Sequence, residues 1–244
     1  MPCADDQVGA VRRALGLLDA FRIDEPRLTM AELARRVDLP KTSALRLART
    51  LEAMGYLVQT EKRDWRLGPS AAWLGARYQV AFDLKGAVHP ALRALALETH
   101  RPATFFVREG DARVRLMRVE ADAEVHKAPV GQQLPLERGS PGKVILAFIG
   151  KQGKLFDEIR LRGWHITIAE ASGTSASVSA PVFGAGWSVI GAINISCPSE
   201  GMSYAALEAY VPAVIAAGRG LSTALMRWEQ TEQRVKPPAS YWHP

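Results

Sequence analysis

The sequence predicts an α+β fold in which a small helical domain with a short hairpin precedes a larger mixed domain. Two helical segments joined by a three-residue turn lie in the first quarter of the chain, and two strand-like runs follow them directly. Beyond about residue 87 the hydrophobic period changes, and apolar positions alternate over several runs. We therefore expect an N-terminal winged helix-turn-helix, a connecting helix, and a C-terminal domain with a mainly antiparallel sheet and flanking helices.

The first helices are predicted by periodicity and by their caps. Residues 8–23 carry apolar side chains at spacings of three and four. Thr29 and Glu32 form a capping box that begins a second helix. Pro40 ends the turn after that helix and suits the start of a third, expected over about Lys41–Met54. This order is typical of a helix-turn-helix, whose second helix enters the major groove of DNA.

Two short strands with a polar tip follow, as in a wing. Arg46 can reach the edge of a guanine, and the short side chains at the helix start suit phosphate. The candidate DNA contacts are Lys41, Thr42, Ser43, Arg46, Arg49, Lys62 and Arg63. A charged, solvated face used for protein contacts is the alternative. The ordered combination of capping box, proline turn, basic helix and basic wing tip favours double-stranded DNA.

The remaining elements are expected in order along the chain. Residues 69–86 form the connecting helix, on which Trp73, Leu74 and Tyr78 are predicted to bury against a second subunit. Strands are expected at 104–107, 114–119, 175–183 and 188–196, and helices at 88–99, 141–149, 153–162 and 204–228. The expected domains are 1–68 for DNA binding, 69–86 as connector, 87–230 for effector binding, and 231–244 as a tail.

A ligand site is indicated in the second domain. Ser140 is expected to cap the helix that follows, and the free N–H groups at its start favour a carboxylate. Ser177, Asn194 and Ser196 alternate with apolar residues, which directs them to one sheet face. Ordinary capping and solvent-facing strand polarity would explain the same residues equally well.

The composition limits the class of protein. Hydrophobic residues make up 48% of the chain and charged residues 23%, as in ordinary globular proteins. The net charge of +6 suits an anionic partner. Two cysteines, one at the N-terminus, predict no disulfide framework. The acidic start is unlike a signal peptide, and no apolar run approaches the roughly 18 residues of a membrane helix, so we expect a cytoplasmic protein without membrane contact.

Several segments together resemble the IclR family of bacterial regulators. The resemblance begins with the run from Leu33 to Ser43, continues through the run from Thr50 to Leu57, and includes Trp65-Arg66-Leu67-Gly68. It extends in order through Gly142-Lys143, Arg162-Gly163-Trp164, Glu170, 180–183 and 193–196. Because it covers nearly the whole chain, it is more specific than any single motif. It implies a GAF-like effector domain, a homodimer or dimer of dimers, and transcription set by a small ligand.

The resemblance also implies an effector site. Family ligand positions fall on Ser140, Pro141, Thr167, Ser177, Asn194 and Ser196, and an apolar wall falls near His126, Leu134 and Ser175. Family ligands are often small organic or aromatic acids. We therefore expect an acid whose carboxylate is held by neutral donors near Ser140. This chain departs from the family at Thr167, where an acid is common, and at Asn194, where serine is frequent.

An enzyme and an architectural DNA-binding protein are the alternatives. Cys197 with His126 or His165 would provide a nucleophile and a base, although a lone cysteine after a strand is usually a small buried residue. The histidines and cysteines show no metal-ligand spacing, and no glycine-rich phosphate loop is present, so we expect no catalytic residue, metal or cofactor. An architectural protein does not explain the second domain.

Overall fold

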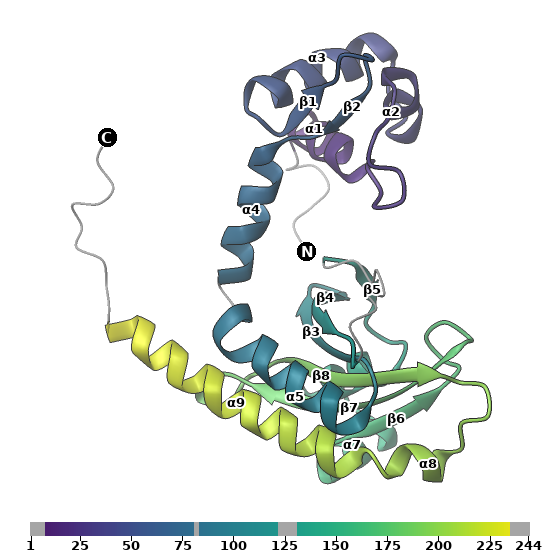
Figure 1. Ribbon diagram of the computed structural model, residues 1–244, viewed down its shortest axis with the longest axis vertical. Coiled ribbons are helices and arrows are strands. Elements are labelled where there is room, and N and C mark those ends of the chain that lie inside the picture. Colours follow the sequence, from purple (N-terminus) through teal and green to yellow (C-terminus); the bar gives the residue numbers. More distant parts are fainter. Residues whose placement is uncertain (1–7, 81–82, 122–130, 235–244) are drawn as a thin grey trace. The chain divides into compact units, whose positions relative to one another are not determined.

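The computed structural model describes residues 8–80, 83–121 and 131–234 (Figure 1). The chain divides into two compact units: the N-terminal unit, Met1–Ala81, and the C-terminal unit, Phe82–Pro244. Each has its own buried core.

The N-terminal unit is the predicted winged helix-turn-helix. Its described elements are α1 (Gly9–Asp19), α2 (Met30–Arg36), α3 (Lys41–Ala53), β1 (Leu57–Gln59), β2 (Trp65–Leu67) and α4 (Pro69–Val80). The capping box is confirmed: the Thr29 hydroxyl accepts from the Glu32 N–H at 3.3 Å, and the Glu32 carboxylate accepts from the Thr29 N–H at 2.8 Å. β1 and β2 pair antiparallel, with Leu57 opposite Leu67.

The core of this unit differs in part from the predicted helix faces. Leu17, Leu33 and Trp65 are buried at its centre. On α3 the buried residues are Ala44, Ala48 and Leu51, whereas Met54, which continues the spacing of three from Leu51 at the end of the expected helix, is 61% exposed. Because α3 ends at Ala53, Met54 lies in the C-terminal cap and leaves the helical period.

The C-terminal unit contains a six-stranded sheet in the order β5-β4-β3-β8-β7-β6, with every neighbouring pair antiparallel. Its strands are β3 (Ala103–Glu109), β4 (Ala112–Val119), β5 (Gln133–Pro135), β6 (His165–Ile168), β7 (Ser175–Phe183) and β8 (Val189–Pro198). The antiparallel sheet confirms the predicted fold class. β5 and β6 were not predicted, because runs of three and four residues carry too little periodicity.

Helices flank this sheet. They are the π-helical turn η2 (Leu84–Val88), α5 (His89–Thr99), α6 (Ser140–Phe148), α7 (Lys154–Arg162), the 3-10 turn η3 (Ala185–Trp187), α8 (Tyr204–Glu208) and α9 (Val211–Arg234). The single helix expected over 204–228 is therefore two helices. Pro212 lies in the first turn of α9, where its missing N–H is tolerated and where a continuous helix would be interrupted.

The sheet has one apolar face and one polar face. Figure 1 shows α5 and α9 along the apolar face, where Phe105, Val178 and Ile193 are buried. Their strand neighbours Thr104 and Asn194 point to the other face, against which α6 packs. The polar face therefore lies between the sheet and α6.

One apolar segment has the composition of a membrane span. Among the described residues, Tyr204–Arg227 is long enough to cross a membrane, and an 18-residue window within it has a mean hydropathy of 1.2. Val214, Leu221 and Leu225 of this segment are buried in the apolar core on the sheet. This packing identifies α9 as a core helix.

Candidate functional site

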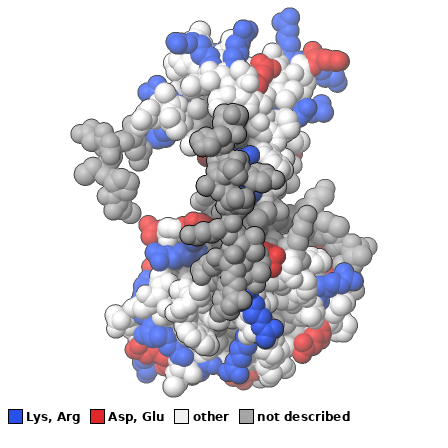
Figure 2. Space-filling model, turned by 90° about the vertical axis from the view of Figure 1, so that its left-hand side faces the viewer, with Lys and Arg blue, Asp and Glu red and all other residues white. Residues whose placement is uncertain are grey.

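The exposed face of α3 is basic. Lys41, Thr42, Arg46 and Arg49 are exposed, and Ser43 is half-buried. Among the described residues, no ion pair engages the charged members of this set. Figure 2 shows Lys and Arg side chains projecting from the surface of this unit. Unpaired, exposed cations on a helix after a three-residue turn are suited to bind an anionic backbone.

The wing tip adds two more exposed cations, Lys62 and Arg63. The tip is closed by the Thr60 N–H, which donates to the Asp64 carbonyl at 2.7 Å, and Arg63 adopts a positive φ of 65° in the turn. The structure thus places every sequence-predicted DNA contact at the surface of the same unit.

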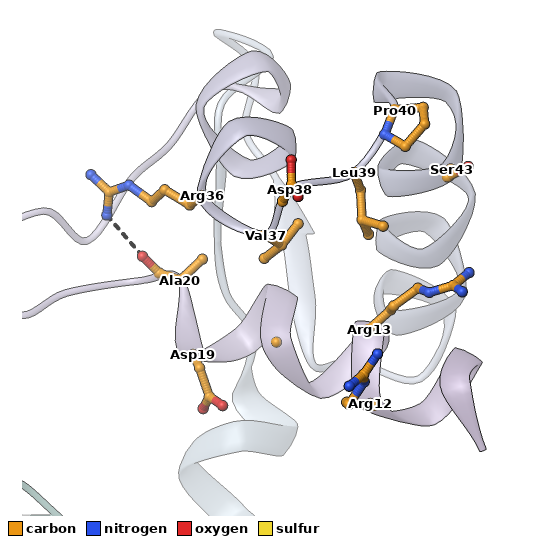
Figure 3. Close-up of a pocket in the computed structure, with 11 residues that line it drawn as sticks. Arg12, Arg13, Asp19, Ala20, Arg36, Val37, Asp38, Leu39, Pro40 and Ser43 are labelled. Atoms are coloured by element: carbon orange, nitrogen blue, oxygen red, sulfur yellow. Dashed lines mark hydrogen bonds between the residues drawn. The ribbon is translucent and has the colours of Figure 1, made fainter. Parts of the chain in front are cut away.

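Two arginines that the sequence analysis missed lie beside α3. A hollow of about 790 Å³ separates α1 from the turn between α2 and α3, and Figure 3 shows Arg12, Arg13 and Ser43 on its walls. Arg13 also lines a second hollow of about 420 Å³ with Arg46 and Arg49. The adjacent pair Arg12-Arg13 was visible in the sequence, but only the packing of α1 against α3 brings it to the basic face.

The polar face of the C-terminal sheet holds a cavity of about 310 Å³. Six sequence-predicted residues line it: Leu134, Pro141, Ser175, Ser177, Asn194 and Ser196. Ser140 and Thr167 are buried behind this lining, with 0% and 6% of their surface exposed. His126 lies outside the described residues.

Ser140 is the centre of a closed hydroxyl network. Its Oγ lies 2.8 Å from Ser177 Oγ and 2.7 Å from Ser179 Oγ, and its N–H donates to Thr167 Oγ1 at 2.9 Å. Ser179 in turn donates to Asn194 Oδ1 at 2.9 Å. The network satisfies the buried hydroxyls and ties the start of α6 to β6, β7 and β8.

The capping expectation at this helix is wrong. Gly139, with a φ of 79°, is the N-cap of α6, and Ser140 is the first helical residue without a side-chain capping bond. Pro141 has no N–H to offer, and the Ser140 N–H is already engaged. The start of α6 is therefore poorer in free donors than the sequence predicted.

Three arginines of β4 also line the cavity, contrary to the expectation of neutral donors alone: Arg113, Arg115 and Arg118. Their placement depends on a bulge. Phe105 pairs with Met117, but the next residue, Phe106, pairs with Arg115, so Leu116 is the extra residue of β4. The bulge resets the alternation and brings Arg118 to the face that Arg113 and Arg115 already occupy.

Arg113 is 3% exposed, and its Nη1 donates to the Pro135 carbonyl at 2.6 Å and to the Arg138 carbonyl. Its Nε is buried without a hydrogen-bond partner. Burial, followed by repulsion from Arg115, lowers the pKa of Arg113 to about 10. An unused buried donor of this kind costs about 1–3 kcal/mol, and the guanidinium is still charged at neutral pH.

Arg115 shares this environment. Its Nη1 donates to Gln132 Oε1 at 2.6 Å, while its Nε is buried without a partner. Burial, then repulsion from Arg118, lowers the pKa of Arg115. The guanidinium carbons of Arg113 and Arg115 lie 5.3 and 5.5 Å from the centre of the Phe106 ring, within cation–π range.

Two other cations near the cavity are paired, whereas Arg138, which also lines it, is exposed to water. Arg118 binds Glu120 at 2.5 Å and donates to Ser196 Oγ at 3.3 Å. Lys143 binds Glu170 at 2.6 Å. In the part of the chain that the structure describes, no such ion pair forms at Arg113 or Arg115. The cavity is therefore electropositive, which suits an acidic ligand.

Of the residues considered for catalysis, Cys197 and His165 are not brought together, and His126 lies outside the described residues. Cys197 is buried in the core on the apolar face, and burial raises the pKa of its thiol. His165 pairs with Ser179 on the edge of the polar face. Since the sheet separates the two side chains, they do not form a nucleophile and base. Among the described residues, no group of three potential metal ligands occurs.

Comparisons with known proteins agree across both units. Residues 10–61 match the model of the IclR helix-turn-helix domain, and residues 76–155 and 153–223 match that of the C-terminal domain of the bacterial transcriptional regulator IclR. The Pca regulon regulatory protein of Pseudomonas putida is 25% identical, covering 88% of this chain and 84% of its own. The HTH-type transcriptional regulator BhcR of Paracoccus denitrificans is 27% identical, covering 95% and 93%.

Solved structures share the fold. One is an IclR homolog of Microbacterium hydrocarbonoxydans complexed with 4-hydroxybenzoate, which superposes with a TM-score of 0.77 at 20% identity. The match covers 90% of this chain and all of that one. The Thermotoga maritima IclR superposes with a TM-score of 0.70 at 17% identity over 90% of this chain and 100% of that one.

Proposed function

The chain belongs to the IclR family of bacterial transcriptional regulators, and we propose that a small organic or aromatic acid in its cavity sets its binding to a pseudo-palindromic operator. The chain is a DNA-binding regulator rather than an enzyme, as its named relatives are. The electropositive cavity on the polar face of the sheet is the observation that carries the acid-sensing part of this proposal. The site of action is the cytoplasm, where the operator lies.

The proposed DNA contacts are those of α3 and the wing. Arg46 reads a base edge, while Lys41, Thr42, Ser43 and Arg49 contact phosphates around it. Lys62 and Arg63 contact the backbone or the minor groove from the wing tip. Their exposure and the absence of ion pairs to them within the described ranges support these roles. Arg12 and Arg13 extend the same surface.

The proposed assembly is a homodimer, or a dimer of dimers. On α4, Trp73 is 62% exposed and Leu74 is 53% exposed, and on α1, Val11 and Leu15 are 56% and 55% exposed. Large apolar side chains gathered on one unit at this exposure are typical of surfaces that bind a partner. A symmetric dimer presents two identical recognition helices, and it therefore reads an inverted repeat.

Light scattering measures this assembly directly. We expect a mass of at least twice the 26.6 kDa of one chain at micromolar concentration. Trp73→Ala combined with Leu74→Ala should lower that mass, because both substitutions remove exposed apolar surface. A wild-type mass of one chain would contradict the proposed assembly.

Selection from a random DNA library, followed by anisotropy titrations, tests the function. We expect the enriched sequences to share an inverted repeat. We also expect at least one small organic acid to change operator affinity several-fold without changing binding to unrelated DNA. Enriched sequences that share no inverted repeat, or an operator affinity that no acid alters, would argue against the proposal. The bound 4-hydroxybenzoate of one structural relative makes this compound a natural first probe.

A further inference from the structure

We propose that the cavity takes an organic anion carrying two negative charges, bound beside Arg113 and Arg115 of β4 rather than at the start of α6. The inference rests on the effector-binding role proposed above and specifies the chemical class of the effector. It departs from the sequence-based expectation of one carboxylate held by neutral donors.

The charge balance of the cavity is the first argument. Arg113, Arg115 and Arg118 line it from one strand, and no Asp or Glu is among the lining residues that the structure describes. Glu120 neutralises Arg118, and the nearby Glu170 is engaged with Lys143. Arg138 also lines the cavity without an ion pair among the described residues, but its side chain is exposed to water. The two guanidinium charges that are buried or half-buried, those of Arg113 and Arg115, are therefore left for the ligand. A ligand with two negative charges balances them, whereas a monoanion leaves one uncompensated.

The state of these two side chains is the second argument. Each has a buried Nε–H without a partner, and each is destabilised in its charged form by burial and by a neighbouring arginine. An anion in the cavity relieves that repulsion. Because arginine presents several donors in a planar fork, it suits carboxylate and phosphoryl oxygens equally.

The start of α6 is the third argument. The hydroxyl and the N–H of Ser140 already form hydrogen bonds within the network of Ser177, Ser179 and Thr167. A carboxylate placed there would have to break these bonds. The network instead forms a rigid neutral end of the cavity, next to Asn194 and Ser196. That end is suited to uncharged polar groups of the ligand body, which lies across Phe106.

Calorimetric titration of the full chain with matched probes tests the inference. The pairs are butyrate with succinate and benzoate with terephthalate, and phenyl phosphate serves as a dianion whose charges share one group. We expect each dianion to bind about tenfold more tightly than its matched monoanion, as one additional charged hydrogen-bonded contact implies. Phenyl phosphate distinguishes a phosphoryl headgroup from a dicarboxylate.

Arg115→Gln should abolish the preference for dianions, while Arg115→Lys, which keeps the charge but not the fork, should retain part of it. The matched control is Arg108→Gln, because Arg108 is exposed in the same hairpin and is not among the residues that line the cavity. Circular dichroism checks that each variant is folded. If Arg115→Gln does not fold, the test is made on the wild type at several salt concentrations. Its preference for dianions over matched monoanions must then shrink as ionic strength rises.

Equal affinity within both matched pairs, or a dianion preference that survives Arg115→Gln, overturns the inference. A monoanion that binds and alters operator affinity, with no gain for the dianions, overturns it while leaving the proposed function standing. Binding of none of the five probes at millimolar concentration overturns the inference, and a failure of 4-hydroxybenzoate and the other small organic acids to bind as well overturns the effector part of the proposed function.

Discussion

The two units use arginine in opposite ways. On α3, Arg46 and Arg49 are exposed and make no ion pair within the described residues. On β4, Arg113 is 3% exposed and bound to two carbonyls, and Arg115 is held by Gln132. The first pair is free to adapt to a partner, and the second is fixed before any partner arrives.

This difference matches the two kinds of anion that we propose this chain binds. A long, uniform polyanion such as DNA is held by many exposed charges, each of which is screened by salt. A small ligand offers few contacts, so its site has to be oriented in advance and shielded from water. Holding Arg113 and Arg115 in such a shielded site removes their guanidinium groups from water, and this desolvation lowers their pKa.

The largest effect that sharpens this comparison is expected from Arg113→Ala. The substitution leaves the Pro135 and Arg138 carbonyls without their donor, which should lower the free energy of unfolding of the C-terminal unit by about 2–4 kcal/mol. Thermal and urea denaturation measure this loss. Arg46→Ala is the counterpart on α3 and should change stability by less than about 0.5 kcal/mol. Equal losses in the two variants would break the comparison.

Operator affinity should respond to the same substitutions in the reverse order. Arg46→Ala should cost about 1–3 kcal/mol and relax specificity at one base position, because it removes a base-edge contact. Anisotropy titration against the operator and its single-base variants measures both. Arg93→Ala, at an exposed position of α5, is the control and should leave operator binding unchanged. An unchanged specificity profile in Arg46→Ala would show that α3 does not dock as proposed.

A smaller effect is expected at the wing. Lys62→Ala should weaken binding to all sequences alike and reduce the slope of log affinity against log salt by about one, since one phosphate contact is lost. Titrations at several salt concentrations give the slope. If Lys62→Ala weakened binding to the operator alone and left the slope of log affinity against log salt unchanged, Lys62 would be assigned to base readout instead.

The smallest effect at neutral pH is expected at His165. Burial, then the charge of Lys143, lowers its pKa to about 4 from the ordinary 6.5. The folded state therefore binds fewer protons than the unfolded state between these values, and stability should fall as the pH drops from about 6.5 to about 4. The described residues of the N-terminal unit contain no histidine, so this dependence belongs to the C-terminal unit.

Denaturation curves at pH 7, 6, 5 and 4.5 measure the dependence. His165→Gln should lose less stability than the wild type over this range. His89→Gln, at an exposed position of α5, is the matched control and should follow the wild type. A wild-type pH dependence that His165→Gln reproduces would place its origin elsewhere.

Local signals in the sequence determined the N-terminal unit almost completely. Its signals act over a few residues and can therefore be recognised in the sequence alone. They are the capping box at Thr29 and Glu32, the proline before α3 and the basic face of α3. The strands β7 and β8 were equally predictable from the sequence, because long alternating runs determine which side chains share a face. The polar positions Ser177, Asn194 and Ser196 followed from that alternation.

The tertiary structure alone decided which groups surround the cavity. Arg113 and Arg115 alternate with apolar residues and were open to prediction, but Arg118 joins them only through the bulge at Leu116. Ser140 carried an N-cap signal, yet its hydroxyl bonds to β7 and its N–H bonds to β6, and the cap position is left to Gly139. Strand register and long-range hydrogen bonds depend on residues far apart in the chain. No local pattern of side chains records them, because the same pattern is compatible with several pairings.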